Sequence, residues 1–162
     1  MKISLGLLAL AGCLSTFSVS AAGPNQSDLF KALAECKASA QQVADFNGLV
    51  DAGQLSLPKD VPHSPWGGGA WQVTPALTVH GVSSTTAVMT DRASFFLQAK
   101  SSSPKADAEK LASTLKLQKV LDTDGYVDFQ RSLDNGATLR VVSTEDKDID
   151  LYVGCSYQQN AS

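Results

Sequence analysis

The chain has 162 residues, of which 43% are hydrophobic and 18% charged, and its formal net charge at pH 7 is −3. This length fits one domain with a sizeable hydrophobic core, and the composition excludes wholesale disorder. The small acidic surplus argues against a nucleic-acid-binding protein, which normally carries a basic excess. Two histidines and three cysteines leave little material for a metal site, so we expect neither a metal nor a cofactor.

The first 22 residues have the layout of a secretory signal peptide. Lys2 supplies a positive charge, residues 3–14 are almost wholly apolar or small, and small residues end the segment at 19–22. We therefore expect a mature chain that starts at Ala22 or Gly23, with residues 23–162 forming a single domain. The apolar run is shorter than the roughly 20 residues that cross a bilayer, and no membrane span is expected later in the chain.

A second interpretation of the N-terminus stays open. Residues 10–13 read Leu-Ala-Gly-Cys and resemble the lipobox of bacterial lipoproteins, in which the cysteine is acylated. Lipidation at Cys13 would leave the apolar residues Leu14 and Phe17 in a tether that is normally polar. We therefore expect a periplasmic or secreted protein, and the alternative location is the membrane surface, as a lipoprotein anchored through Cys13.

Two cysteines remain beyond the signal segment, Cys36 and Cys155. An even pair in an oxidising compartment predicts one disulfide, against the alternative of two free buried thiols. Cys36 lies on the apolar stripe of a predicted helix, and Cys155 lies on the apolar face of a predicted strand. Both sulfurs point into the core if that helix packs on the sheet, which favours the bridge.

The first predicted element is an amphipathic helix over residues 28–46, with Ser27 as its N-cap and Asn47-Gly48 as its stop signal. Its apolar stripe consists of Leu29, Leu33, Cys36, Ala40 and Val43, at spacings of four and three. Residues 49–72 contain three prolines and three consecutive glycines. Because proline removes backbone donors and glycine weakens regular elements, this segment predicts a long irregular loop.

After residue 72, apolar and polar residues alternate as they do in β-strands. A second predicted helix, over 104–116, begins at Pro104 and interrupts this pattern. The expected strands lie around Leu77–Val79 and at 85–90, 93–99, 119–121, 126–133, 137–143 and 149–157. Asp91-Arg92 marks either a turn or the exposed middle of one long strand, and Asn135-Gly136 is a strong hairpin signal. The predicted fold is α+β: an antiparallel sheet of about five to six strands with a C-terminal meander, and both helices packed on one face.

No sequence motif for a nucleophile elbow, zinc protease, phosphate loop or Cys-x-x-Cys redox site is present, so we expect a protein that is not an enzyme. Four residues resemble part of a calcium loop: Asp122, Asp124, Gly125 and Asp128. Their glycine comes too early for an EF-hand and the closing glutamate is missing, so a solvated hairpin turn is the better interpretation. His63 and His80 are expected to be surface histidines.

Two features favour binding to another protein. The run Trp66, Gly67, Gly68, Gly69, Ala70, Trp71 is either a connector with its tryptophans in the core or a recognition loop, since tryptophan is over-represented at interface hot spots. The second feature is an acidic surplus confined to the C-terminal meander and its turns, including Asp146 and Asp148. Such acidic turns would speed association with a basic partner.

These observations predict an exported, non-enzymatic protein of a bacterial cell envelope that binds another protein. An inhibitor or immunity-type protein matches this architecture: a small exported domain with one disulfide and no catalytic motif. Two alternatives stay open. One is a lipid-tethered accessory subunit of an envelope assembly, decided by Cys13, and the other is a small periplasmic hydrolase that uses carboxylates and a histidine.

Overall fold

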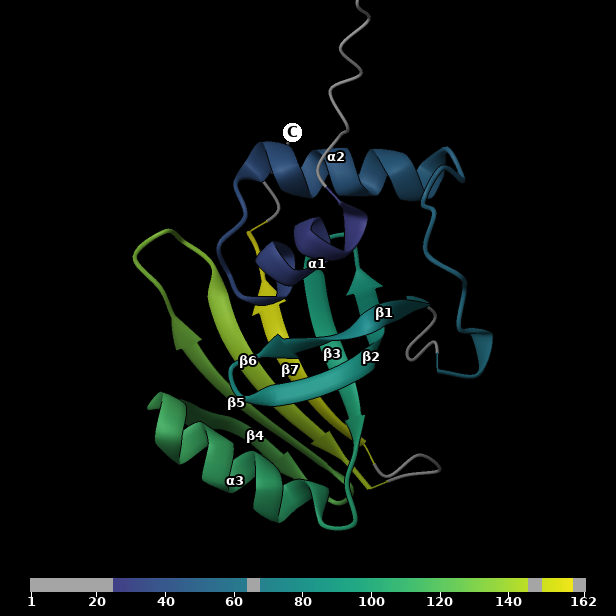
Figure 1. Ribbon diagram of the computed structural model, residues 1–162. Helices are drawn as coiled ribbons and strands as arrows, with labels where there is room; N and C mark the ends of the chain where they lie inside the picture. The colour runs from purple at the N-terminus through teal and green to yellow at the C-terminus, as the bar shows by residue number, and fades with distance from the viewer. Residues whose placement is uncertain (1–24, 64–67, 146–149, 159–162) are drawn as a thin grey trace, which may run out of the picture.

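The computed structural model describes residues 25–63, 68–145 and 150–158 of the chain (Figure 1). Its helices are α1 (Gln26–Ala34), α2 (Ala40–Asp51) and α3 (Pro104–Leu115), with a short 3-10 helix η1 (Val61–His63). Its strands are β1 (Gly69–Val79), β2 (Val82–Asp91), β3 (Ser94–Lys100), β4 (Gln118–Thr123), β5 (Tyr126–Ser132), β6 (Thr138–Thr144) and β7 (Asp150–Ser156). The predicted α+β class is confirmed. Seven strands form instead of five or six, and Asp91-Arg92 proves to be a turn between β2 and β3.

All seven strands belong to one antiparallel sheet in the order β1-β2-β3-β7-β6-β5-β4. Helices α1 and α3 pack on the same face of this sheet, as predicted, and share one hydrophobic core with it. The β1–β2 hairpin curls in front of the neighbouring strands on that side (Figure 1). Strand β1 can turn in this way because its pairing with β2 is irregular between Gln72 and Leu77.

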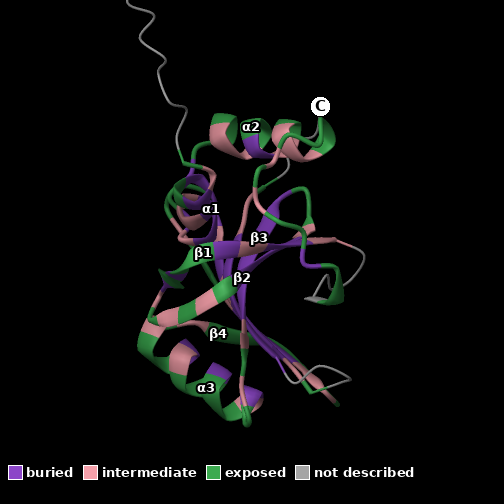
Figure 2. Ribbon diagram, turned by 45° about the vertical axis from the view of Figure 1, so that its right-hand side comes forward, coloured by how far each residue is buried: buried purple, intermediate pink, exposed green. Residues whose placement is uncertain are grey.

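The opposite side of the sheet, which we call the open face, also buries side chains. Val88, Phe96, Val142 and Tyr152 form a small apolar cluster there, although no described helix packs on it. In Figure 2 the central strands of the sheet are buried over almost their whole length, because they bury side chains on both faces. Both faces of β7 are therefore buried, and Asp150 and Tyr152 are buried as fully as Leu151.

The single N-terminal helix predicted over 28–46 is wrong, because the chain breaks at residues 35–39 and forms two helices. Cys36 adopts a left-handed φ of 60° beyond the end of α1, so it does not lie on a helical stripe. Ser39 then starts α2 through a capping box with Gln42. The N-cap of α1 is Asn25 rather than Ser27, since the Asn25 side chain accepts the Ser27 N–H.

The irregular segment between α2 and β1 is shorter at both ends than the loop predicted over 49–72. Helix α2 runs through Asn47-Gly48 to Asp51 and ends before Gly53, whose φ is 64°. Strand β1 begins at Gly69, where a Cβ atom would lie 2.5 Å from the ring of Trp71. A Cβ atom on Gly68 would lie 2.0 Å from the carbonyl oxygen of Met89. Close packing, rather than pliability, therefore requires glycine at both positions.

The predicted Cys36–Cys155 disulfide is present, with Cα atoms 5.2 Å apart. It joins the segment between α1 and α2 to strand β7, which lies 119 residues further along the chain. Asn135, in the β5–β6 turn, donates from Nδ2 to the Cys36 carbonyl oxygen at 2.8 Å. The end of α1 is thus fixed to both β7 and the β5–β6 hairpin.

Candidate functional site

A groove of about 620 Å³ opens beside the start of β1, and we call it the Trp71 groove. This volume lies within the range of ordinary ligand-binding pockets. One wall comes from the end of α2 and the segment after it, and the other comes from the β2–β3 turn. Its apolar lining is Val50, Leu55, Leu57, Val61, Trp71 and Met89. Lys59, Asp91 and Arg92 supply its charged groups.

The two walls of the groove are held together by α2. Arg92 of the β2–β3 turn forms a two-point ion pair with Asp51, with both nitrogen–oxygen distances 2.7 Å. Asn47 donates from Nδ2 to the Arg92 carbonyl oxygen at 2.8 Å. The Arg92 guanidinium lowers the pKa of Asp51 by hydrogen bonding, and Asp51 raises the pKa of Arg92 in return. Residues from two distant parts of the sequence therefore set the width of the groove.

The segment that leads into η1 is attached to the free edge of β1. The Gln72 N–H donates to the Pro58 carbonyl oxygen, and the Asp60 N–H donates to the Ala70 carbonyl oxygen, both at 2.8 Å. The Asp60 carboxylate is buried and accepts hydrogen bonds from the side chains of Gln72 and Thr86. This attachment covers a sheet edge and leaves Val61, whose exposed fraction is 75%, at the rim of the groove.

The described part of the predicted recognition loop lies in this groove. Gly68, Gly69 and Trp71 all line it. Trp71 is only 3% exposed and packs edge-on against Phe46 of α2, with ring centroids 5.9 Å apart. Trp71 is thus a core residue that also forms the floor of the groove, as the connector interpretation expected for a tryptophan. Trp66 and Gly67 lie outside the described residues, as do Asp146, Asp148 and the candidate lipidation site Cys13.

The groove continues onto the open face of the sheet. Thr90 and Asp91 line both the Trp71 groove and a second hollow of about 210 Å³, whose other residues are Phe96, Tyr126, Arg140 and Val142. The Arg140 guanidinium lies 5.6 Å from the centroid of the Phe96 ring. It also pairs with the buried Asp128 carboxylate, with Nη2 and Oδ2 2.5 Å apart. The interpretation of Asp128 as part of a solvated turn is therefore wrong.

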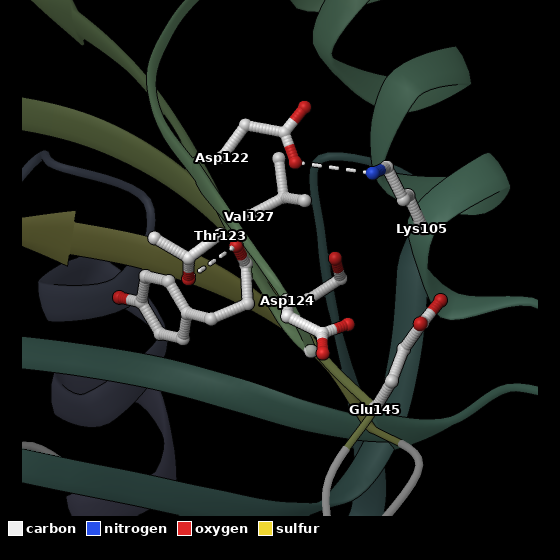
Figure 3. A pocket seen from close by; sticks show the side chains of 9 residues that line it. Lys105, Asp122, Thr123, Asp124, Val127 and Glu145 are labelled. Carbon is white, nitrogen blue, oxygen red and sulfur yellow. Dashed lines mark hydrogen bonds and ion pairs between the residues drawn. The ribbon is translucent and has the colours of Figure 1, made fainter.

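Figure 3 shows a third, polar hollow, of about 230 Å³. Tyr126 is a lining residue of both the second and the third hollow. Three carboxylates line the third hollow, those of Asp122, Asp124 and Glu145. Asp122 pairs with Lys105 at 3.0 Å. A hydrogen bond from Lys119, and then the one from Lys105, lower the pKa of Asp122. Asp122, Asp124 and Glu145 thus gather around one hollow on the α3 side of the sheet.

Carboxylates of the open face are engaged within the fold. Asp150 is fully buried, accepts a hydrogen bond from Gln98 Nε2 at 2.7 Å and pairs with Lys100 at 2.8 Å. Tyr152 hydroxyl accepts from the same Gln98 nitrogen at 3.1 Å. The strand pattern of residues 149–157 did not indicate that Asp150 and Tyr152 are buried. A signal was the polar residue Gln98 within the apolar run of β3, directly opposite Tyr152.

The structure does not bring a histidine to these carboxylates within the described residues. His80 lies in the β1–β2 turn with a φ of 49°, and its Nε2 atom is buried without a hydrogen-bond partner. Burial lowers the pKa of His80, and the charges acting on it belong to Glu35, Lys37 and Arg131. The interpretation of His80 as a plain surface histidine is wrong, since the ring is half-buried. The side chain of His63 lies outside the described part.

The described residues contain no group of three histidine, cysteine or acidic side chains arranged to hold a metal ion. Among the described helices, none has the length and apolar character needed to cross a bilayer. No protein-family model, curated protein or solved structure matches this chain. The function must therefore be argued from the surface itself.

Proposed function

We propose that this chain is an exported, non-enzymatic envelope protein that binds a protein partner, as an inhibitor or immunity-type protein does. The observation that carries this proposal is the apolar Trp71 groove, which meets the hollow on the open face at Thr90 and Asp91. A separate hollow, lined by the carboxylates of Asp122, Asp124 and Glu145, lies on the α3 side of the sheet. An apolar side chain of the partner enters the groove, and basic side chains of the partner face this acidic hollow. This division follows the usual anatomy of an interface, with an apolar anchor and a charged periphery.

Several features support binding rather than catalysis. The floor of the groove is a rigid core tryptophan, and its walls are fixed by the Arg92–Asp51 pair. A preformed apolar groove reduces the ordering that a bound partner must impose. In contrast, the buried carboxylates Asp128 and Asp150 are paired with basic groups. Export is supported by the signal-peptide pattern of the sequence and by the Cys36–Cys155 bridge.

Val61→Asp tests the proposal without disturbing the core, because Val61 is largely exposed at the rim of the groove. Affinity capture of the mature domain from its native envelope, followed by mass spectrometry, identifies the partner. Val61→Asp is expected to weaken its binding by about tenfold or more, because a charge would then enter an apolar contact. Val120→Asp is the matched control, since Val120 is also an exposed strand-compatible residue, in β4, away from the groove.

The control variant should bind the captured partner as the unmodified protein does. Glu145→Lys should slow association, with an effect that shrinks as salt concentration rises. Equal binding by the Val61→Asp variant and the unmodified protein would contradict the proposed use of the groove. Turnover of a substrate by the purified mature domain would contradict the non-enzymatic proposal.

A further inference from the structure

The last strand of the sheet, β4, has no neighbouring strand on one side among the described residues. It stands at the end of the strand order and, within the described residues, pairs only with β5. All six of its residues are exposed, including Val120 at 55% and Leu121 at 46%. These two are adjacent, and Val61 is the other large hydrophobic residue exposed in the described chain. An edge strand presents backbone N–H and C=O groups that can pair with another strand.

A bulge in β4 determines which of its side chains share a face. Lys119 is paired with Phe129 and Leu121 with Asp128, so Val120 is an extra residue without its own partner. The residue after Leu121 is Asp122, which is paired with Val127. The bulge therefore brings Lys119 and Asp122 to the same face, where Lys119 Nζ lies 2.9 Å from Asp122 Oδ2. In a regular strand, residues 119 and 122 would point to opposite faces.

With the bulge counted, β4 is symmetric in its chemistry about Leu121. Lys119 lies one pairing position to one side of Leu121, and Asp122 lies one position to the other side. Gln118 and Thr123, both polar, lie at the second position on either side. An antiparallel partner of identical sequence, centred on Leu121, would therefore meet this strand with opposite charges aligned. A two-fold axis through the strand edge requires that self-complementary pattern.

We propose that two copies of this protein associate through their β4 edges, in an antiparallel pairing centred on Leu121. The two Leu121 side chains then meet on the open face of the joined sheets. On the other face, Lys119 of each copy lies opposite Asp122 of the second copy, twice by symmetry. The free backbone groups along β4 pair with each other, as in other cases of strand addition to a sheet edge.

The ion pairs within each copy do not prevent this association. Lys119 and Asp122 are both substantially exposed, with side-chain exposures of 40% and 37%. Their contact within one copy is a surface ion pair, and such pairs stabilise little. Helix α3 packs on β5, β6 and β7, and it reaches the β4 side chains through Lys105 and Glu109. A six-residue edge buries less area than a standard interface, so we expect a weak, concentration-dependent dimer.

Sedimentation equilibrium of the purified mature domain, from micromolar to millimolar concentration, tests the proposal. The unmodified protein is expected to form dimers reversibly, and Leu121→Lys is expected to remain monomeric with an unchanged circular dichroism spectrum. Val61→Asp is the control and should dimerise normally, because the Trp71 groove is separate from β4. This control also separates the present proposal from the proposed partner binding. A monomeric unmodified protein at every concentration would overturn the inference.

Charge reversal tests the register directly. Lys119→Glu places two acidic groups opposite each other at both symmetric positions, and Asp122→Lys does the same with two basic groups. Each variant alone is expected to associate about tenfold more weakly or worse than the unmodified protein. An equimolar mixture should recover association, because the glutamate introduced in one copy would face the lysine introduced in the other. Circular dichroism spectra establish that each variant is folded, and a mixture of the two folded variants that stays monomeric would overturn the proposed register.

Discussion

The Tyr157 hydroxyl lies 2.9 Å from the carbonyl oxygen of Leu33, to which it donates a hydrogen bond. The same hydroxyl accepts the N–H of Ala38 at 3.2 Å. One side chain from the C-terminal end of the sheet therefore satisfies backbone groups on both sides of the break between α1 and α2. It stands beside the Cys36–Cys155 bridge, so two independent links hold this break against the sheet.

Tyr157→Phe should lower the free energy of unfolding by about 1–2 kcal/mol, because it leaves the Leu33 and Ala38 backbone groups without this partner. Burial raises the pKa of Tyr157 from 10.0 to about 12, against a smaller lowering by its hydrogen bond with Ala38. The folded protein thus retains a proton that the unfolded chain loses above pH 10. The contribution of the Tyr157 hydroxyl to the free energy of unfolding should be fully present below pH 10, and it should decline as the pH rises towards 12.

Urea unfolding of the unmodified protein and of Tyr157→Phe at several alkaline pH values measures both effects. The variant should lose the part of the alkaline decline that Tyr157 causes. Parallel declines in the two proteins would contradict the role assigned to the hydroxyl.

The cysteine pairing was predictable, whereas the local structure around it was not. Export and an even cysteine count predicted the bridge, and the strand alternation placed Cys155 correctly. The spacing of Leu29, Leu33 and Cys36 indicated a continuous helix, but the bridge and the capping box at Ser39 favour a break with Cys36 in a left-handed conformation. These interactions come from residues far away in the sequence or from a cap inside an apparent stripe, which periodicity does not detect.

The candidate site was also predictable only in part from the sequence. The composition of residues 66–71 left a connector and a recognition loop as alternatives, and Gly68, Gly69 and Trp71 line a groove. The opposite walls of that groove come from Val50, Val61 and Arg92, which no local pattern connects to the tryptophan. Burial of Asp128 and Asp150 could not be predicted from the pattern of their own strands, because the partners Arg140 and Gln98 lie on other strands.

Opening the disulfide should destabilise the protein strongly. Cys36→Ser, Cys155→Ser and the double variant each remove the same link across 119 residues, so each should cost about 2–5 kcal/mol of unfolding free energy. The three costs should agree closely, because the second substitution removes nothing that the first has left. Denaturant titration measures them. Recovery of two free thiols by non-reducing peptide mapping of the oxidised, folded protein would contradict the prediction.

His80 should make the protein less stable in mild acid. Burial is the main cause that lowers its pKa below 6.5, so the unfolded chain binds this proton more readily than the folded protein does. The His80 contribution is complete above pH 6.5 and is lost as the pH falls below that value. His80→Asn preserves the left-handed backbone conformation, which asparagine tolerates.

Chemical denaturation between neutral pH and the onset of carboxylate titration should show a shallower decline for His80→Asn than for the unmodified protein. Identical declines would show that the titration of His80 does not influence folding in this range.

The mature N-terminus should be Ala22 or Gly23, because small residues occupy the positions that a signal peptidase recognises at 19–22. Intact-mass spectrometry of the protein from its native envelope measures this directly. A diacylglyceryl adduct on Cys13 would contradict ordinary export and support the lipid-tethered alternative.

The two tryptophans should respond in opposite ways to replacement by alanine. Trp71 is buried against Phe46, so Trp71→Ala should cost about 3–5 kcal/mol of unfolding free energy. If Trp66 is the residue presented to a partner, Trp66→Ala should leave the melting temperature nearly unchanged. It should weaken partner binding by about 2 kcal/mol or more, the scale of an interface hot spot.

Differential scanning calorimetry and titration with the captured partner measure the two quantities separately. Charge reversal at Asp146 and Asp148 should slow association, and the effect should shrink as salt rises, because those charges steer the approach rather than hold the complex. Destabilisation by Trp66→Ala, with unchanged binding for each folded molecule, would contradict the recognition-loop interpretation. Binding would then have to depend on the Trp71 groove without Trp66, and Val61→Asp would still reduce it.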